Sequence, residues 1–491
     1  MRKSKKLISI LLVTILISSL VIGCTKKDTK DKDSEDTGKL SENIVEDRST
    51  DVVVIGTGGA GLAAALEAKN GEKDVIIVEK MSIVGGNTLR ATGGLNAAGT
   101  SVQKELGIED SPEKHFEDTM KGGHEKNDPE LVKIMTDNAA DAVEWLIGIG
   151  ADLSDVGRLG GASNDRAHRP TGGAPVGSHI IKVLHENAEK EGIEILLDTT
   201  ATEILYEDNK VKGIVAKDKD GNEFKIESKA VIVATGGFGA NSDMVVEYNE
   251  SLKGFGTTNH PGATGDGITM ATAIGADLVQ MEEIQTHPTV VPDNGFMITE
   301  AVRGNGAILI NREGKRFINE IGTRDVVSEG ILAQEKQTAF LFFDEGIRES
   351  LKAIDKYVDM GLTTEGESIE ELAKALDING ENLAETVKLY NEYVDAKEDK
   401  EFSRPDMPRK IEKAKYYAIE VGPAIHHTMG GLKINTKAQV LNKEGNPISG
   451  LYAAGEVVGG VHGGNRLGGN ALADIIVFGR IAGNTSVEDM E

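Results

Sequence analysis

Two apolar runs, separated by a glycine-rich turn and a helical stretch, form the clearest pattern in the chain. Thr50–Ile55 is apolar and rich in β-branched residues, which predicts a buried strand. Gly56–Gly61 (G-T-G-G-A-G) follows at once, Leu62–Lys69 predicts a helix, and Asp74–Glu79 predicts a second strand. The segment therefore predicts a βαβ unit in which a glycine-rich turn leads into the first helix.

The glycine-rich turn has the spacing of a dinucleotide-binding fingerprint. Glycines let the backbone approach a pyrophosphate, which binds at the N-terminus of the following helix. Glu79 lies 23 residues beyond Gly56, where an acidic side chain is expected to bind ribose hydroxyls. The fingerprint alone does not distinguish NAD from FAD. A glycine-rich turn without a ligand is the alternative, and the surrounding βαβ pattern argues against it.

The first 24 residues have a different pattern, that of a bacterial lipoprotein signal. A basic segment precedes the apolar run Leu7–Ile22, which closes on V-I-G-C, a lipobox-like cleavage site. We expect residues 1–23 to be a signal peptide and Cys24 to be lipidated, which would anchor the protein to the extracytoplasmic face of the cell membrane. An uncleaved anchor helix is the alternative. Residues 24–48 are polar and charged, which predicts a flexible tether.

Charge and cysteine content exclude several classes of protein. The net charge is −26, which argues against binding of nucleic acid. Cys24 is the only cysteine, so the chain can form no internal disulfide, no C-x-x-C-H haem site and no cysteine-ligated iron–sulfur cluster. No metal site is predicted. An acidic protein also repels anions at long range, so an anion site must be a local region of positive potential.

Six side chains in the last two-fifths of the chain are the candidate substrate-binding residues. They lie in dense, glycine-rich contexts such as I-T-E-A-V-R-G-N-G-A and G-G-N-R-L-G-G-N-A. Two arginines, two histidines and a Thr-Glu pair suit a pocket that holds a small dianion by forked, charge-assisted hydrogen bonds. Next to a dinucleotide site, such a pocket indicates a flavoenzyme that acts on a small carboxylate. The six are His287, Thr299, Glu300, Arg324, His426 and Arg466.

The segments T-E-A-V-R-G-N-G-A, H-H-T-M-G-G and N-R-L-G-G-N-A carry a family resemblance. In them the chain resembles the soluble fumarate reductase flavoproteins, the group of flavocytochrome c fumarate reductases and their single-subunit relatives (FAD-dependent oxidoreductase 2 type), from about Asp51 to Gly483. The resemblance implies an α/β fold: a two-dinucleotide-binding, Rossmann-like FAD domain of the glutathione reductase type with an inserted α+β capping domain. We expect the FAD domain at 49–280 and 427–491, and the cap at 281–426.

Further segments agree with this architecture. Ala230–Gly239 (A-V-I-V-A-T-G-G-F-G) is a strand and turn typical of flavoproteins with two dinucleotide folds. Amphipathic stretches at Ile369–Leu376 and Asn382–Tyr393 fall within the expected cap. A cleft between the two bodies is where a small substrate is expected to bind.

The resemblance also implies how FAD is bound. Membrane-bound relatives attach FAD through a histidine shortly after the second strand, but no histidine occurs between Glu79 and Lys114, so we expect non-covalent FAD. His427 either touches the flavin or is a packed structural histidine. The implied cofactor-binding residues are Gly56, Gly58, Gly59, Ala60, Gly61, Glu79, Lys80, Asn87, Thr88, Gly93, Gly94, Ala201, Thr235, Gly236, Asp266, His427, Glu456, Gly469, Asn470, Ala471 and Leu472.

For the substrate, the resemblance places a dicarboxylate between two groups of side chains. His287, Thr299 and Glu300 would face one carboxylate from the cap. His426 and Arg466 would hold the other near the FAD domain. Gly93 is a further expected substrate contact.

For the reaction, the resemblance implies hydride transfer from flavin N5 to one alkene carbon and proton transfer to the other. Arg324 would give the proton, and a relay of Arg303, Glu300 and Arg324 would restore it. A free arginine, with a pKa above about 12, is a poor general acid, which is why a relay is needed. The alternatives are that Arg324 is a plain substrate or salt-bridge arginine and that a histidine is the donor.

The predicted function is thus an extracytoplasmic, FAD-dependent fumarate reductase that produces succinate. Reduction of another α,β-unsaturated carboxylate, such as methacrylate, acrylate, cinnamate or urocanate, is the closest alternative. A flavin-carrying lipoprotein that only shuttles electrons would need no proton relay, and a neutral steroid would not suit a pocket rich in cations. Because haem sites are excluded, a separate protein or a quinone-linked carrier is expected to supply the electrons.

Overall fold

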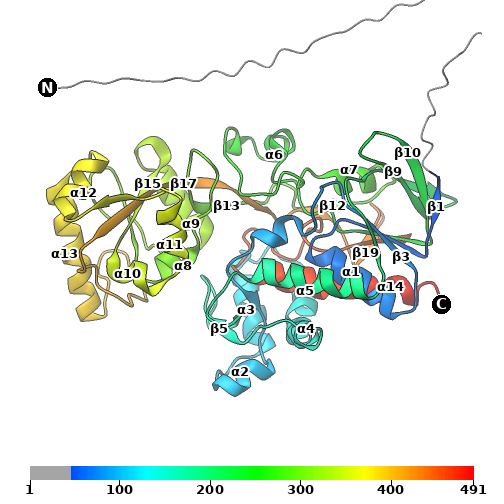
Figure 1. Ribbon diagram of the computed structural model, residues 1–491, viewed down its shortest axis with the longest axis horizontal. Helices are drawn as coiled ribbons and strands as arrows, with labels where there is room; N and C mark the ends of the chain where they lie inside the picture. The colour runs from blue at the N-terminus through cyan, green and yellow to red at the C-terminus, as the bar shows by residue number, and fades with distance from the viewer. Residues whose placement is uncertain (1–45) are drawn as a thin grey trace, which may run out of the picture. The chain divides into compact units, whose positions relative to one another are not determined.

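The computed structural model describes residues 46–491 (Figure 1). The predicted signal peptide, Cys24 and residues 24–45 of the predicted tether lie outside the described residues. The tether was predicted to run to residue 48, but Arg48 already belongs to a strand: β1 (Arg48–Ser49) pairs in parallel with β10 (Glu223–Glu227). Within the described residues, no helix is both long enough and apolar enough to cross a membrane.

The largest sheet within residues 46–491 has ten strands, and its centre is parallel. The parallel strands stand in the order β20, β11, β2, β3, β7, and an antiparallel group of β8, β9 and β10 continues the sheet beyond β20. With β1 and β10 given above, the strands are β2 (Val52–Ile55), β3 (Val75–Val78), β7 (Glu194–Leu196), β8 (Thr200–Glu207), β9 (Lys210–Lys217), β11 (Ala230–Val233), β19 (Gln439–Leu441) and β20 (Pro447–Ala453).

The predicted βαβ unit is present in this sheet. Every residue of β2, β3 and β11 is buried, because helices or loops cover both faces of the parallel part. Helix α1 (Gly59–Asn70) connects β2 to β3, and the two strands pair in register from Val52 opposite Val75. Continuous burial explains why these strands appear in the sequence as unbroken apolar runs.

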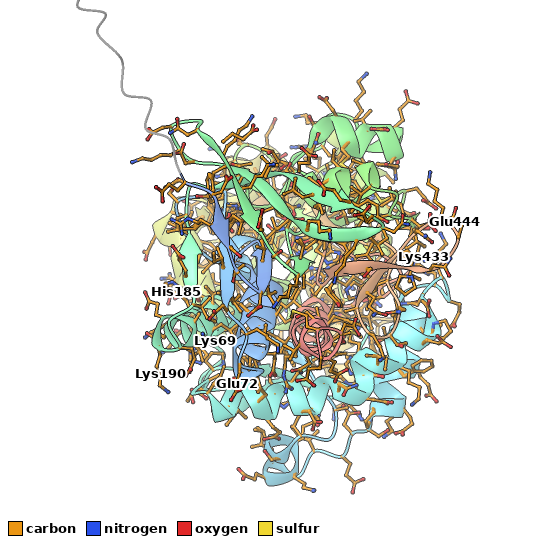
Figure 2. All side chains as sticks on the ribbon, turned by 90° about the vertical axis from the view of Figure 1, so that its right-hand side faces the viewer. Lys69, Glu72, His185, Lys190, Lys433 and Glu444 are labelled. Atoms are coloured by element: carbon orange, nitrogen blue, oxygen red, sulfur yellow. The ribbon has the colours of Figure 1, made fainter. Side chains whose placement is uncertain are left out.

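Helix α1 packs against α14 (Asn470–Glu488) and α5 (Val176–Lys190), and the three helices lie side by side in Figure 1. A Cβ on Gly479 of α14 would lie 2.6 Å from the carbonyl oxygen of Ala60, so only glycine permits this close approach. Lys190, at the end of α5, points away from the core (Figure 2), and Lys69, near the end of α1, lies 3.6 Å from Asp74.

Smaller elements surround the sheet. The α3–α4 pair packs with α14, and a small antiparallel sheet of β4, β6 and β5 lies beside the loop that precedes α14. The elements are 3₁₀ helix η1 (Gly86–Arg90), β4 (Leu95–Asn96), α2 (Ser101–Leu106), α3 (Pro112–Gly122), α4 (Pro129–Gly148), β5 (Asp155–Gly157), β6 (Ala167–Arg169), α6 (Ser242–Tyr248), η2 (Glu250–Leu252), α7 (Asp266–Ala273), β12 (Leu278–Val279) and β18 (Gly431–Leu432).

A second body, which we call the cap, has its own antiparallel sheet in the order β13, β17, β15, β14, with β16 also on β17. Its elements are β13 (Ile284–Val290), α8 (Glu300–Gly304), β14 (Ile308–Ile310), α9 (Arg324–Leu332), η3 (Glu335–Gln337), β15 (Ala339–Asp344), α10 (Glu345–Ser350), α11 (Ala353–Asp359), β16 (Thr364–Gly366), α12 (Ile369–Leu376), α13 (Gly380–Ala396) and β17 (Tyr416–Thr428). Both predicted amphipathic stretches are helices, α12 and α13. They lie on the left of Figure 1, far from α1 and α14.

The cap has a hydrophobic core of its own. That core runs from Ile298 to Val421, whereas the core around the large sheet includes Met281 and Ile425. Strand β17 therefore contributes to both cores, with Val421 in one and Ile425 in the other. The fold is thus α/β with an α+β cap, as predicted, and the domain boundaries at 280/281 and 426/427 stay a prediction.

Candidate active site

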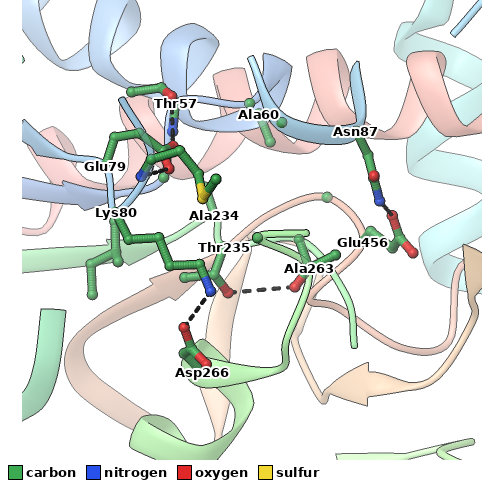
Figure 3. Close-up of a pocket in the computed structure, with 18 of the residues that line it drawn as sticks. Thr57, Ala60, Glu79, Lys80, Asn87, Ala234, Thr235, Ala263, Asp266 and Glu456 are labelled. Atoms are coloured by element: carbon green, nitrogen blue, oxygen red, sulfur yellow. Dashed lines mark hydrogen bonds and ion pairs between the residues drawn. The ribbon is translucent and has the colours of Figure 1, made fainter. Parts of the chain in front are cut away.

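Two adjoining cavities lie at the carboxyl ends of the parallel strands and between the large sheet and the cap. The first surrounds the β2–α1 turn (Figure 3), and the second continues toward the cap with a volume of about 690 Å³, a size typical of small-molecule sites. They share the lining residues Asn87, Thr88, Glu456 and Ile475. An elongated ligand can therefore occupy both.

The first cavity is an open cradle at the N-terminus of α1. A Cβ on Gly58 would meet no atom closer than 3.8 Å, and one on Gly236 would meet nothing within 4 Å. By contrast, a Cβ on Gly61 would lie 2.0 Å from the carbonyl oxygen of Gly56, so Gly61 serves the turn itself. Backbone N–H groups at a helix N-terminus, next to glycines that leave space, fit a dinucleotide pyrophosphate.

Charged side chains border this cradle. Glu79 accepts hydrogen bonds from the backbone N–H (3.0 Å) and hydroxyl (2.6 Å) of Thr57, which fixes the carboxylate at the end of β3 (Figure 3). Lys80 forms an ion pair with Asp266 at 2.6 Å. Glu79 is thus at the position where the fingerprint predicts a ribose contact.

The predicted cofactor residues are distributed over both cavities. Gly61 and Asn470 line neither, because Gly61 packs in the turn and Asn470 is fully buried among Asn96, His115 and Thr119. The first cavity is lined by Gly56, Gly58, Gly59, Ala60, Glu79, Lys80, Asn87, Thr88, Ala201, Thr235, Gly236, Asp266 and Glu456. The second is lined by Asn87, Thr88, Gly93, Gly94, His427, Glu456, Gly469, Ala471 and Leu472.

All six candidate substrate residues line the second cavity, although they come from widely separated elements. Five of them lie on a strand or at the start of a helix: His287 on β13, Thr299 at the N-cap of α8, Glu300 in α8, Arg324 at the start of α9 and His426 on β17. Arg466 lies in the loop that precedes α14. Arg303 does not line the cavity. It lies one helical turn beyond Glu300 and is buried behind it.

Glu300 is the centre of an ion-pair chain. Its Oε1 accepts a hydrogen bond from Nε of Arg324 at 2.5 Å, and Nη2 of Arg303 lies 3.8 Å away. Burial alone would raise the pKa of Glu300, but the guanidinium groups of Arg324 and Arg303 lower it below its usual value. Burial lowers the pKa of Arg303 to about 10. The residues predicted to form a proton relay are therefore in contact.

Gln285 is a site residue that the sequence reasoning did not single out. Its Oε1 accepts from Nη1 of Arg324 at 3.0 Å and from Nη2 of Arg466 at 3.3 Å, so one amide oxygen holds both arginines. Gln285 lies two residues before His287 on β13. The period of two along a strand could have identified it.

Arg466 is a buried cation without an anionic partner in the described part of the chain. Its side chain is 5% exposed, it donates to the Leu467 carbonyl and to Gln285, and its buried Nε has no partner there. Burial lowers the pKa of Arg466 to about 9, and Arg324 adds to the effect. A buried charge is costly unless it is paired, so this arrangement is suited to an anionic ligand.

The histidines of the cavity are held neutral. Burial lowers the pKa of His287 well below its usual value, and Arg324 adds to the effect; the same two causes act on His426. Nδ1 of His287 accepts from the backbone N–H of Thr289 at 3.3 Å, which leaves Nε2 as the donor. Nδ1 of His426 lies 2.7 Å from the hydroxyl of Thr258. Neutral imidazoles of this kind donate hydrogen bonds rather than protons.

A dinucleotide cradle that opens directly into a cation-lined substrate cavity defines a flavin-type redox enzyme. Residues 51–472 match the family model described as FAD binding domain. The chain is 52% identical to a fumarate reductase (cytochrome) of Shewanella frigidimarina over 90% of its own length and 77% of the relative's. It is 39% identical to a urocanate reductase of Eggerthella lenta, over 88% of this chain and 74% of that one.

A solved structure of a fumarate reductase is also similar to this chain. The open conformation of a flavocytochrome c3 fumarate reductase superimposes with a TM-score of 0.79 at 44% identity, over 90% of this chain and 78% of that one. The chain therefore belongs to the FAD-binding domain family, and it is an FAD-dependent oxidoreductase. The open Gly58 and Gly236 cradle and the shared wall of the two cavities fit FAD as its cofactor.

Proposed function

We propose that this oxidoreductase acts on a CH–CH group and reduces fumarate to succinate, with a small dicarboxylate held between the cap and the FAD site. The observation that carries the proposal is the pairing of the inner charges of the second cavity: Glu456, the second carboxylate that lines it, forms no ion pair with Arg324 or Arg466, and burial raises its pKa. Arg324 and Arg466 both contact Gln285, while Glu300 is the only carboxylate paired with either of them within residues 46–491. A dianion of two carboxylates would supply the missing negative charge.

Neutral donors complete the binding site on both sides. His287 and Thr299 lie on the cap side, and His426 lies next to the FAD-binding residues. Their rings and hydroxyl donate hydrogen bonds without adding charge that the substrate would have to neutralise. Two carboxylates at opposite ends of a short alkene fit donors arranged in this way better than a neutral steroid does.

Proton delivery is the task of the three ion-paired residues. Arg324 keeps one guanidinium nitrogen, Nη2, without a partner among the described residues, and it lines the cavity. Glu300 links it to Arg303, whose lowered pKa makes this guanidinium a better proton source than a solvent-exposed arginine. FAD, bound non-covalently, supplies the hydride.

Reduction of another enoate is the second candidate. The urocanate reductase of Eggerthella lenta and an acrylate oxidoreductase of Vibrio harveyi, at 39% and 35% identity, share this family. A site for acrylate or urocanate needs only one carboxylate contact, and the donors His287, Thr299 and His426 around Arg466 favour two. A pure electron shuttle would have no use for the Arg303–Glu300–Arg324 chain.

We also propose that the enzyme works as a lipid-anchored protein outside the cytoplasmic membrane. The lipobox-like V-I-G-C segment supports this, and it lies in the part of the chain that the structure does not describe. A separate electron-transfer protein or a quinone-linked carrier would then reduce the flavin. An acidic protein of net charge −26 is suited to a partner with a basic surface.

A panel of enoates distinguishes the two candidates. The holoprotein is mixed with reduced viologen dye, and reoxidation is followed with fumarate, acrylate, methacrylate, cinnamate and urocanate as oxidants. We expect kcat/KM for fumarate to exceed the others by at least about 30-fold, because each lost carboxylate contact costs about 2–5 kcal/mol. A higher kcat/KM for a monocarboxylate would contradict fumarate as the substrate and assign that monocarboxylate instead.

A further inference from the structure

Two exposed cations stand at the mouth of the substrate cavity. Of the charged residues within 46–491 that line this cavity, Arg90 and Lys356 are the two that are exposed, and both are basic. Arg90 belongs to η1 on the FAD side, and Lys356 belongs to α11 of the cap. The two sides of the opening therefore each carry one positive charge.

Both cations are free to interact with a mobile anion. Neither forms an ion pair with any residue of the described part of the chain. Arg90 donates one hydrogen bond to the carbonyl of Thr258 at 3.1 Å, and the ammonium of Lys356 lies 5.6 Å from the ring centre of Phe296. Asp355 and Asp359 lie on α11 beside Lys356, but neither lines the cavity, and Asp355 pairs with Arg348 at 3.0 Å. Asp293 is exposed and does not line the cavity either.

The residues next to the two cations also contact the inner binding residues. Thr258, which accepts from Arg90, lies with its hydroxyl 2.7 Å from Nδ1 of His426. Tyr357, the neighbour of Lys356, accepts from the backbone N–H of Thr299 at 3.2 Å. One residue therefore connects each outer cation to a donor that is expected to bind one end of the substrate.

We propose that Arg90 and Lys356 form an outer site that captures dicarboxylates before they reach Arg324 and Arg466. The inference rests on the proposed dianionic substrate. A protein of net charge −26 repels dianions at long range, so substrate approach requires a local reversal of potential at the opening. Two exposed cations without ion-pair partners among the described residues, one from η1 and one from the cap, provide it, and their effect must weaken as salt screens them.

The test compares kcat/KM for fumarate at low and high ionic strength. At about 10 mM ionic strength, where the Debye length is about 30 Å, we expect Lys356→Gln and Arg90→Gln each to lower kcat/KM about threefold and the double variant about tenfold. In about 0.5 M salt the differences should fall below about 1.5-fold. Lys356→Arg should keep the wild-type rate because it keeps the charge.

Two controls distinguish electrostatic attraction of the substrate by Arg90 and Lys356 from a general effect of removing a surface charge. Lys352 is exposed just before α11 and does not line the cavity, so Lys352→Gln should keep the wild-type kcat/KM. Monomethyl fumarate has one charge instead of two, so the variants should reduce its kcat/KM by a smaller factor. Equal losses at low and high salt, equal losses for both substrates, or a loss in Lys352→Gln as large as in Lys356→Gln would each overturn the proposal.

A direct binding measurement keeps this proposal separate from the proposed function. The association rate constant of succinate with the oxidised holoprotein is measured by stopped flow from the change in flavin absorbance. We expect it to fall in Lys356→Gln at low salt, with the dissociation rate constant changed less than twofold. If fumarate is not reduced but succinate association still depends on these cations, the outer site stands and the assigned substrate is wrong. An unchanged association rate constant in both Lys356→Gln and Arg90→Gln would contradict the outer site.

Discussion

Arg466 illustrates how a single residue can indicate the charge of the ligand that a site binds. Its guanidinium is buried, its acceptors within residues 46–491 are the Leu467 carbonyl and Gln285, and its Nε has none there. A buried charge without an ion-pair partner costs free energy, and binding of an anion offsets that cost. The same residue is therefore expected to stabilise a bound anion.

Replacing Arg466 should weaken substrate binding and stabilise the free protein. In Arg466→Ala we expect KM for fumarate to rise and kcat to fall, with a loss in kcat/KM that corresponds to about 2–5 kcal/mol, because a carboxylate partner is lost from both ground and transition states. Steady-state kinetics with reduced viologen measures both constants. A fall in kcat at unchanged KM would assign Arg466 to the chemical step instead of to binding.

His115 predicts a pH dependence of stability. It is fully buried, its Nε2 lies 3.0 Å from Oδ1 of Asn470, and burial lowers its pKa to about 4. The unfolded chain, with a histidine pKa of about 6.5, binds a proton below that pH while the folded protein does not, so stability is complete above about pH 6.5 and is lost as the pH falls. Asp110, Asp118 and Arg166 are the charged groups around it.

We expect His115 to lower the free energy of unfolding by about 2 kcal/mol when the pH falls from 7 to 5. Urea unfolding of the wild type and of His115→Gln, which keeps an N–H donor toward Asn470, should show that the variant loses about 2 kcal/mol less over this range. Parallel pH profiles of the two proteins would mean that His115 is protonated in the folded state.

At the scale of elements, the cap is held by a buried ion cluster beneath α8. Glu320 is fully buried and accepts from Arg316 at 2.8 Å and from Arg404 at 3.1 Å. Arg404 also donates to the backbone carbonyl of Arg303, and the backbone carbonyl of Glu320 accepts from the Arg303 side chain. The cluster therefore fixes the helix that carries Glu300 and Arg303.

Breaking this cluster should destabilise the cap strongly. Glu320→Gln removes the charge on which two buried arginines converge, and we expect a loss of about 3–5 kcal/mol in the free energy of unfolding. Glu313→Gln is the matched control, because Glu313 pairs with Lys315 at the surface with both side chains more than half exposed. Urea unfolding should show no measurable change for the control. Similar results for both variants would argue against a structural role for the cluster.

Elements with a continuous pattern were predictable from the sequence, and contacts between distant elements were not. Burial on both faces gave β2 and β3 their apolar runs, and α12 shows the amphipathic pattern of a surface helix over its whole observed range. Gln285 was missed because its role depends on Arg324 and Arg466, which lie 39 and 181 residues away in the chain. Lys356 was missed because an exposed lysine has no distinguishing pattern until the fold places it at an opening.

At the scale of the whole molecule, an acidic protein contains a basic cavity. The net charge of −26 suits a soluble body, and the substrate site is a local exception formed by residues from both the cap and the FAD-binding part. Both bodies are needed, since His287 and Arg324 lie in the cap while Arg466 precedes α14. The reaction therefore depends on how the two bodies come together, and on delivery of electrons from outside.

Cys24 is the residue on which the proposed membrane attachment depends. In Cys24→Ala we expect the protein to leave the membrane fraction or to fail in maturation, because no other lipidation site is predicted. One acyl chain binds only marginally, so firm attachment requires the several chains of a mature lipoprotein. Cell fractionation with a lipid label measures this. Membrane retention of the variant, together with an unlabelled wild type, would contradict the anchor.

The proposed function requires that the cavity hold a dianionic enoate and that Arg324 protonate it. The most direct measurement is kcat for fumarate reduction by Arg324→Ala, with FAD content and succinate Kd determined on the same sample. We expect kcat to fall by about 10²–10⁴-fold, the contribution of a positioned general acid, while FAD stays bound and Kd rises by less than about tenfold. A kcat near that of the wild type would contradict the assignment and leave a histidine or water as the proton donor.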